Sequence, residues 1–460
     1  MSAEQGKRQI ANEKICQEMA EHMLSLALRA GADGAEVLVR DGAELEVKIR
    51  MGETELVKEA CSRGLGLRVL KEDRAAVTYT SDFDAQAMRN FAEESVALCR
   101  LAEPEPLAAL PSREEMAREI PALDLWDESV LSIDVAEAMR WAKAGEQAAF
   151  NFDARVVNSE GASFGRGVGA VAFATSAGFS AAYRGSNVSF VVEPVCDDSE
   201  GKKRNGYHYT SNRFVAGLQA AEDVGIEAAR RTVAKLGSRK VATCQVPAVF
   251  SPEAGRSLLG QFASVISGGA VWRKNSYLAE REGTLVASPL VSIVDDPLLP
   301  RAPGSRPFDS EGLAVRPNVV VSEGVLRTFL LDVYSARKLG RKSTACAGRG
   351  LGGGPHVTTS NFILRPGKSS AKEAANVAHG LYVTQLMGFG FNPVTGDFSQ
   401  GAAGFWIEKG EKAYPVSEVT ISVNFDDLWK GIDVVANDID ARSSVQCPTF
   451  RVARVTVAGT

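Results

Sequence analysis

The chain has 460 residues, of which 45% are hydrophobic and 24% are charged, and its formal net charge is −5. This length and composition are typical of a globular protein with two or three domains, and the mild negative charge argues against a general nucleic-acid binder. Seven cysteines without a CxxC pair argue against a disulfide framework or a zinc ribbon. The polar N-terminus lacks the apolar core of a signal peptide. We therefore expect a cytoplasmic protein that neither enters a membrane nor binds nucleic acid.

Residues 1–105 are expected to form an N-terminal α+β unit. Apolar side chains at three- and four-residue spacing predict a helix over residues 13–30. A second helix is predicted over residues 81–101. Between the helices, turn signals such as Asp41-Gly42 separate four predicted strands, over residues 35–40, 45–50, 64–70 and 75–79.

Residues 106–237 are expected to form a central α+β region that completes one N-terminal domain with residues 1–105. Prolines and acidic residues over 102–125 predict a linker or a surface arm. The elements that follow are a helix, strand-like segments and a long helix, predicted over residues 132–150, 154–193 and 213–236. Asn212 is the expected N-cap of the long helix.

Residues 238–460 are expected to form a β-rich C-terminal domain. Helices are predicted here only over residues 252–267, 335–339 and 371–379. Segment 387–411, MGFGFNPVTGDFSQGAAGFWIEKGE, combines turn glycines with five large aromatic residues, which predicts a strand–turn–strand ribbon at the centre of the domain. The sequence thus predicts an α+β fold, with an N-terminal helix and sheet region followed by a β-rich C-terminal domain.

Two short motifs match functional signatures but lack the required context. Residues 348–353 match GxGxxG, which binds dinucleotides only between a strand and a helix, whereas β-prone residues 356–359 follow here. Residues 161–165 match GxSxG, in which the serine must lie on a strand-to-helix turn. The strand-like sequence that follows predicts a turn between two strands instead.

Metal chemistry has little support in the sequence. The four histidines, His22, His208, His356 and His379, are too far apart to share a helix face, and neither HExxH nor HExxxH occurs. A zinc site needs three or four clustered protein ligands, so only distant residues could form one. His356, in a glycine-rich loop, is the best candidate among the histidines for contact with a ligand.

Segment 387–411 resembles the C-terminal signature of the TldE family, also called PmbA and grouped with proteins named modulators of DNA gyrase. Further matches to that family occur in order along nearly the whole chain. Many matches at compatible spacing are more specific than any single motif. They comprise residues 30–36, 63–66, 79–82, 158–162, 177–179, 358–361, 414–416 and 454–459.

The resemblance implies that this chain pairs with a TldD-like chain in a cytosolic heterodimeric zinc metallopeptidase. Such a complex degrades unfolded peptides and removes leader segments from modified peptides. The zinc belongs to the TldD-like partner, whose HExxxH motif lies on the helix corresponding to residues 252–267. Gly260 and Gln261 stand where that motif would begin, so no catalytic residue, metal site or cofactor is expected in this chain. Cys447 is interpreted as a partly buried thiol.

On this interpretation the chain is a non-catalytic subunit that completes the active-site chamber and helps to guide an extended peptide. Open strand edges in the β-rich domain would hold the peptide by strand addition. The expected cleft loops are residues 348–361 and 387–401. The polar residues expected to bind peptide are His356, Thr358, Asn361, Asn392 and Asp397, for which turn-stabilising hydrogen bonds are the alternative role.

Two other functions stay open from the sequence. In the first alternative the chain is an autonomous hydrolase that acts as a homodimer and uses Ser163 or a metal site built from distant residues. In the second alternative it is a binding protein that modulates gyrase or a toxin–antitoxin pair. A homodimer is also conceivable for an isolated non-catalytic subunit, because a surface built for a homologous partner is often partly self-complementary.

Overall fold

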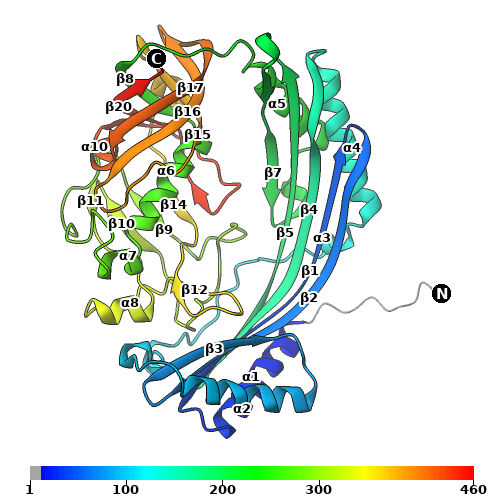
Figure 1. The fold of residues 1–460 in the computed structure, drawn as a ribbon, viewed down its shortest axis with the longest axis vertical. Helices are drawn as coiled ribbons and strands as arrows, with labels where there is room; N and C mark the ends of the chain where they lie inside the picture. Colours follow the sequence, from blue (N-terminus) through cyan, green and yellow to red (C-terminus); the bar gives the residue numbers. More distant parts are fainter. Residues whose placement is uncertain (1–11, 460) are drawn as a thin grey trace.

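The computed structural model describes residues 12–459, which form two halves that lie side by side (Figure 1). The first half extends to α5 and is dominated by one long, curved sheet, and the second begins at β8. The predicted α+β fold with a β-rich C-terminal domain is confirmed. No helix among the described residues is long and apolar enough to cross a membrane. The first 11 residues, part of the polar N-terminus considered above, lie outside the described residues.

The first half is built on a seven-stranded sheet in the order β3-β2-β1-β4-β5-β6, with β7 also paired to β5. Strands β1 and β4 pair over most of their length, so one sheet runs through residues 1–105 and 106–237. The predicted boundaries between these regions, and at residue 238, stay predictions. The strands are β1 (Gly34–Arg50), β2 (Glu53–Lys71), β3 (Arg74–Thr80), β4 (Val156–Thr175), β5 (Phe179–Asp197), β6 (Lys203–Asn205) and β7 (His208–Asn212).

Two predicted turns are wrong, one at Asp41-Gly42 and one at residues 161–165, because their glycines lie inside long strands. Asp41-Gly42 falls within β1, where Gly42 lies opposite Gly169 of β4. A Cβ on Gly42 would lie 2.8 Å from the carbonyl oxygen of Val168, so glycine here permits close approach of two strands. Ser163 of the GxSxG match lies within β4 and pairs with strands on both sides, which leaves no strand-to-helix turn for a nucleophile.

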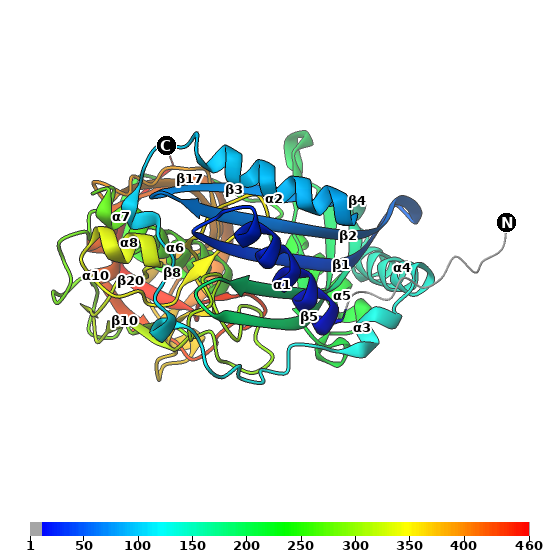
Figure 2. The same cartoon turned by 90° about the horizontal axis from the view of Figure 1, so that it is seen from below.

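Alternation along the sheet strands decides which face each helix covers. Val37 and Val39 of β1 pack against α1 and α2 at one end of the sheet. Figure 2 shows these two helices lying across this end of the sheet, seen from below. Leu45 and Val47 pack against α4 and α5 at the other end. The intervening side chains project from the opposite face, which faces the second half (Figure 1). The helices are α1 (Glu13–Arg29), α2 (Ala85–Cys99), α3 (Glu128–Ser132), α4 (Val135–Phe152) and α5 (Ala221–Val233).

The long helix predicted over residues 213–236 is wrong at its start. Asn212 ends strand β7, and its side-chain oxygen accepts a hydrogen bond from the backbone N–H of Phe214, which makes a turn. Arg213 reaches across to the second half and donates to the carbonyl oxygen of Ala302. The helix itself begins only at Ala221.

The second half has one large core between two sheets. The larger sheet runs β17-β16-β15-β8-β20-β18, and a β17–β20 pairing closes it over part of its length. This pairing occupies part of the open strand edges that were expected to hold a peptide by strand addition. A five-stranded sheet runs β11-β10-β9-β14-β19, and β12 pairs with β13. The larger sheet contains β8 (Cys244–Phe250), β15 (His379–Met387), β16 (Asp397–Glu408), β17 (Glu411–Asn424), β18 (Ile432–Val435) and β20 (Phe450–Ala458).

The remaining strands and the helices of the second half are short, apart from α6. The strands are β9 (Ile293–Asp295), β10 (Asn318–Ser322), β11 (Val325–Leu326), β12 (Ala347–Gly348), β13 (His356–Val357), β14 (Phe362–Leu364) and β19 (Val445–Gln446). The helices are α6 (Pro252–Val265), α7 (Gly268–Trp272), α8 (Val333–Lys338), α9 (Ala371–Ala374) and α10 (Phe425–Lys430). The helix predicted over 371–379 is shorter than expected, because His379 begins strand β15 and pairs with Glu408.

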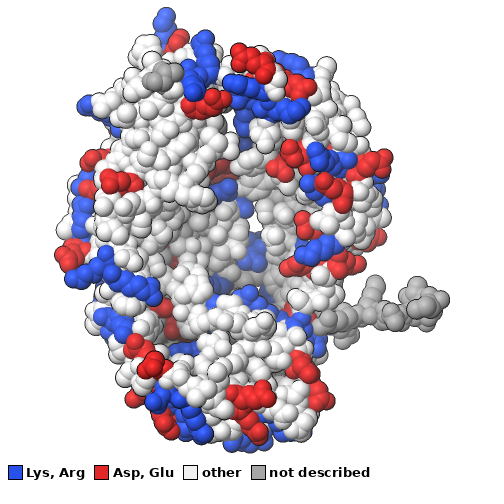
Figure 3. All heavy atoms as spheres, viewed as in Figure 1, with Lys and Arg blue, Asp and Glu red and all other residues white. Residues whose placement is uncertain are grey.

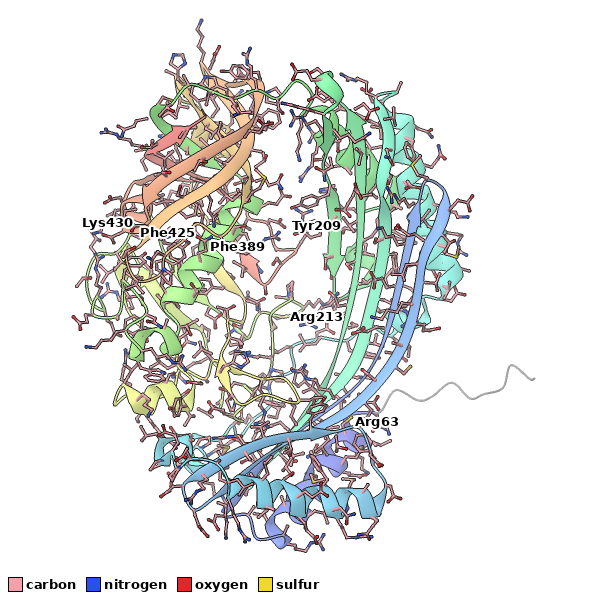
Figure 4. All side chains as sticks on the ribbon, viewed as in Figure 1. Arg63, Tyr209, Arg213, Phe389, Phe425 and Lys430 are labelled. Carbon is pink, nitrogen blue, oxygen red and sulfur yellow. The ribbon has the colours of Figure 1, made fainter. Side chains whose placement is uncertain are left out.

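Segment 387–411 forms the predicted strands and turns, but its aromatic residues are not all packed inside. Phe391 and Phe398 lie 4.5 and 5.9 Å from the ring of Phe425. Phe389, in the loop between β15 and β16, is fully exposed at 103%, and Figure 4 shows its position. The prediction of a wholly internal ribbon is therefore wrong at the tip of this loop.

Candidate functional site

The junction between the two halves contains three cavities, each lined by residues from both halves. The upper cavity, of about 440 Å³, lies between α5 and strands β15 to β17. The middle cavity, of about 570 Å³, lies between the residues after β7 and the loop 299–303. The lower cavity, of about 370 Å³, lies between strands β1, β4 and β5 and the loop 348–358. Figure 3 shows the hollow between the halves, with Lys and Arg atoms in its walls.

The upper cavity is rich in charged side chains. Helix α5 carries Glu227, Arg230 and Arg231 at three- and four-residue spacing, which places all three on one helix face, and both arginines lie within 2.8 Å of the glutamate. The first turn of α6 adds Glu253, Lys235 comes directly after α5, and the other contributions come from strand β17 and a late loop. The charged residues that line the cavity are Glu227, Arg230, Arg231, Lys235, Glu253, Lys412, Asp440 and Arg442.

Arginines pair with the carboxylates of the upper cavity. Burial opposes ionisation of Glu227, but hydrogen bonds from Arg230 and Arg231 outweigh it and lower the pKa of Glu227 to about 2. Glu253 bridges the two halves, since Arg231 of α5 lies 2.8 Å and Arg442 lies 3.3 Å from the same carboxylate oxygen. These ion pairs hold the charged side chains of the cavity in place.

Aromatic and basic groups from β7, α6 and two loops meet between the upper and middle cavities. Arg256 of α6 donates to the hydroxyl oxygen of Tyr209 at 2.7 Å, and the guanidinium of Arg442 lies 4.3 Å from the centre of the same ring. Arg213 donates to the carbonyl oxygens of Ala302 and Pro303. Figure 4 shows Tyr209 and Arg213 between the two halves.

The lower cavity lies beside a buried group of charges. Glu36 of β1 is 0% exposed and lies 2.9 Å from Arg68 of β2 and 2.8 Å from Arg349 of the second half. Burial opposes ionisation of Glu36, but the two arginines outweigh it and lower its pKa. The same carboxylate therefore joins a strand of the first half to a loop of the second.

The five residues predicted to bind peptide do not form one site. His356 and Thr358 line the lower cavity, where Arg306 donates to the Thr358 hydroxyl at 3.0 Å. Asn392 and Asp397 line a shallow depression beside Phe389, formed within the second half. There, Asn392 accepts a hydrogen bond from the backbone of Val394, and Asp397 accepts one from the Thr395 hydroxyl, so both stabilise the turn.

Asn361 is placed inside the fold and not in a cavity. It is 0% exposed, and its amide nitrogen donates to the Asp296 carbonyl and the Ser305 hydroxyl. Its side-chain oxygen accepts from the backbone of Gly304. With both ends of the amide occupied, Asn361 holds two loops together and has no free group for a peptide.

Sequence reasoning missed the residues of the upper cavity. Three lining residues come from separate parts of the second half: Tyr382, Lys412 and Arg442. Only the folded chain brings them next to α5. The charge spacing on α5 was a readable signal, but it is equally typical of a solvated helix face. No local motif marks the cavity.

Comparison with known proteins places the whole chain. Three family models match it, for the PmbA/TldA metallopeptidase domain 1 (residues 35–99), central domain (residues 128–236) and C-terminal domain (residues 243–459). The metalloprotease PmbA of Escherichia coli O157:H7 is 36% identical over 449 residues, which cover 98% of this chain and 97% of that protein. The chain belongs to the PmbA/TldD metallopeptidase family. A PmbA homologue of Haemophilus influenzae is 35% identical, with the same coverage.

Solved structures of the PmbA/TldD family share the fold. The crystal structure of a proposed modulator of DNA gyrase from Bacteroides thetaiotaomicron matches with a TM-score of 0.90 at 26% identity, covering 96% of this chain and 99% of that one. TldE from Thermococcus kodakarensis matches with a TM-score of 0.85 at 21% identity, covering 96% and 100%. These two proteins thus share the fold described above.

The family name raises the question of whether this chain binds a metal ion. The donor groups of the described residues do not form a metal site. Among residues 12–459, no group of three His, Cys, Asp or Glu side chains is close enough together to hold a metal ion. On α6, a Cβ at position 260 would meet nothing within 4 Å, so the backbone leaves space for a side chain there, but Gly260 supplies no donor group. Gln261 follows, and its side-chain oxygen is buried without a hydrogen-bond partner.

Cys447 does not compensate for the missing donors. Its thiol is 1% exposed, more buried than the sequence interpretation assumed, and burial raises its pKa well above the ordinary value. Helix α6 packs directly on it, since a Cβ on Gly255 would lie 2.8 Å from the Cys447 sulfur. A protonated thiol in an apolar contact is a poor metal ligand, and Cys447 therefore serves packing.

Proposed function

We propose that this chain is the non-catalytic subunit of a two-chain zinc peptidase, in which a TldD-like partner holds the metal and this chain binds the peptide. The observation that carries the proposal is α6, where space for a ligand side chain remains at position 260 but the donor groups are missing. A zinc peptidase needs a metal-bound water and a base beside it, and α6 offers only one carboxylate, Glu253, which is paired with Arg231 and Arg442. Binding is what the chain retains.

The junction between the halves supports peptide binding by this subunit. Three cavities follow one another along it, and an extended peptide that adds about 3.3 Å per residue would contact several of them at once. Charged and aromatic side chains that line these cavities, such as Lys412 and Phe405, offer contacts that do not depend on one side chain of the peptide. Such contacts suit a subunit that accepts varied unfolded substrates, including leader segments of modified peptides.

Co-expression with a TldD-like chain from the same genome tests the proposal. We expect a 1:1 complex in the cytoplasm, with peptidase activity that requires both chains and is lost on chelation of zinc. Without the partner, this chain is expected to form at most a homodimer. If it elutes separately and the partner is fully active alone, the proposal fails.

A pair of variants locates the contribution of this chain. Arg442→Ala removes a guanidinium that lines the upper cavity and stacks on Tyr209, and we expect it to weaken peptide binding by the complex. Arg454→Ala is the matched control, because Arg454 is exposed on β20 and lies outside the cavity. Its guanidinium donates a hydrogen bond to the side-chain oxygen of Gln245. Equal loss in both variants would show that the junction is not the binding site.

A further inference from the structure

The upper cavity carries more positive charge than its carboxylates can neutralise. Five cationic and three anionic side chains line it, although the whole chain has a net charge of −5. Each of the three carboxylates forms an ion pair with one or two of the three arginines: Glu227 with Arg230 and Arg231, Glu253 with Arg231 and Arg442, and Asp440 with Arg442. Two lysines, Lys235 and Lys412, are left over.

Neither lysine is paired with a carboxylate within the described part of the chain. The ammonium of Lys235 donates to the backbone carbonyl of Asn205 at 2.8 Å. The ammonium of Lys412 lies 3.6 Å from the centre of the Tyr382 ring and 5.5 Å from that of Phe405. An aromatic face attracts a cation, but it leaves the net charge of the cavity unchanged.

The neighbours of the two lysines make their charge costly. Partial loss of hydration, together with repulsion from Arg230 and Arg231, lowers the pKa of Lys412. Loss of hydration and repulsion from Arg231 also lower the pKa of Lys235. A ligand anion placed among these groups would remove this repulsion and would gain hydrogen bonds from charged donors.

We infer that the upper cavity binds a carboxylate of the peptide substrate, so that this subunit selects acidic segments. The inference rests on the proposed peptide-binding function and names the chemistry that one part of the junction recognises. A carboxylate fits better than an isolated small anion, because Tyr382 and Phe405 form an apolar wall next to Lys412. Such a wall would pack against the aliphatic part of a peptide that carries the charge.

Two matched peptides test the inference on the full chain and on its complex with the TldD-like partner. One is a short unstructured fluorescein-labelled peptide with three glutamates, and the other has three glutamines in the same positions. We expect the glutamate peptide to bind about tenfold more tightly at low ionic strength, with the preference shrinking as salt is added. Both peptides are amidated at the C-terminus, so that the glutamate side chains are the only carboxylates that differ between them and the chain terminus contributes none.

Single-charge variants connect the preference to this cavity. Lys412→Gln should reduce the preference for the glutamate peptide by about fivefold. Lys372→Gln is the control, because Lys372 is an exposed lysine of α9 that does not line the cavity, and it should leave the preference unchanged. Equal loss in the two variants would assign the preference to the general charge of the protein and would overturn the inference.

The possible failures are distinguishable. Equal binding of the glutamate and glutamine peptides would overturn the carboxylate site while leaving peptide binding intact. Binding of neither peptide, by the chain alone or by the complex, would overturn the proposed function and the carboxylate site together.

Discussion

At the lower end of the junction, the charge of Glu36 is completely buried and is matched by Arg68 and Arg349. At the upper end, the carboxylates are also matched, but Lys235 and Lys412 are left without one among the described residues. The lower charges are dry and bridge the halves, whereas Lys412 is exposed to the cavity. The comparison teaches that similar side chains have different uses: the lower group joins the halves with its charges matched, whereas the upper group joins them through Glu253 and also leaves two lysines without a carboxylate among the described residues.

Removing the buried charge at the lower end is the strongest test of this difference. Glu36→Gln would remove the carboxylate that forms the ion pairs with both Arg68 and Arg349, and we expect it to lower the free energy of unfolding by about 3–5 kcal/mol. Urea unfolding at pH 7 measures the loss. Asp124→Asn is the control, because the Asp124–Arg301 pair also crosses the junction at 2.6 Å but is about half exposed, and it should cost less than about 1 kcal/mol. Similar losses in both variants would contradict a special role for the buried pair.

The pH dependence of stability distinguishes the lower region further. Asp295, next to the lower cavity, is buried, and burial raises its pKa to about 6. A raised pKa in the folded state means that folding binds a proton, so the contribution of Asp295 is most favourable below about pH 4 and is lost as the pH rises through about 6. Asp295→Asn should therefore be more stable than the unchanged protein at pH 7.5, by up to about 2 kcal/mol, and no more stable at pH 4.

Urea midpoints at the two pH values check this prediction. Asp153→Asn is the control of opposite sign, because hydrogen bonds from Arg155 lower the pKa of Asp153 to about 2. Its contribution is present above about pH 4 and is lost as the pH falls through 2, so this variant should gain nothing at pH 7.5. An Asp295→Asn midpoint that stays below that of the unchanged protein at pH 7.5 would show that this carboxylate is needed in its charged form.

The smallest expected effect is at the upper end, and its sign is the informative part. Lys412→Gln removes a cation that is repelled by Arg230 and Arg231, so stability should stay equal or rise by less than about 1 kcal/mol. Thermal unfolding at low and high salt measures it, and any gain should shrink at high salt. A clear loss of stability would mean that Lys412 is a structural group like Arg349 and is not available to a ligand.

Local patterns were enough for part of this fold. The spacing of Met19, Met23 and Leu26 predicted α1, and the alternation of Leu45, Val47 and Ile49 predicted a half-buried strand. The prediction failed at Gly42, where a glycine that reads as a turn instead allows two strands to approach. Only knowledge of the pairing partner β4, far along the chain, distinguishes these two uses of glycine.

The sequence could assign little of the candidate site. The resemblance to a family suggested that Gly260 and Gln261 of α6 stand where a relative has metal ligands, and this stays a prediction. The upper cavity could not be read, because Arg231, Tyr382 and Lys412 meet only after the two halves have folded against each other. Asn361 showed the opposite error, since a polar residue in a predicted loop is buried and fully hydrogen-bonded.

The most direct test of binding without cleavage uses the purified chain alone, supplied with zinc and an unfolded fluorogenic peptide. We expect the peptide to bind and to remain intact, with cleavage starting only when the TldD-like chain is added. Hydrolysis by the isolated chain that a chelator abolishes would contradict this expectation, because it would require a metal site on the chain itself.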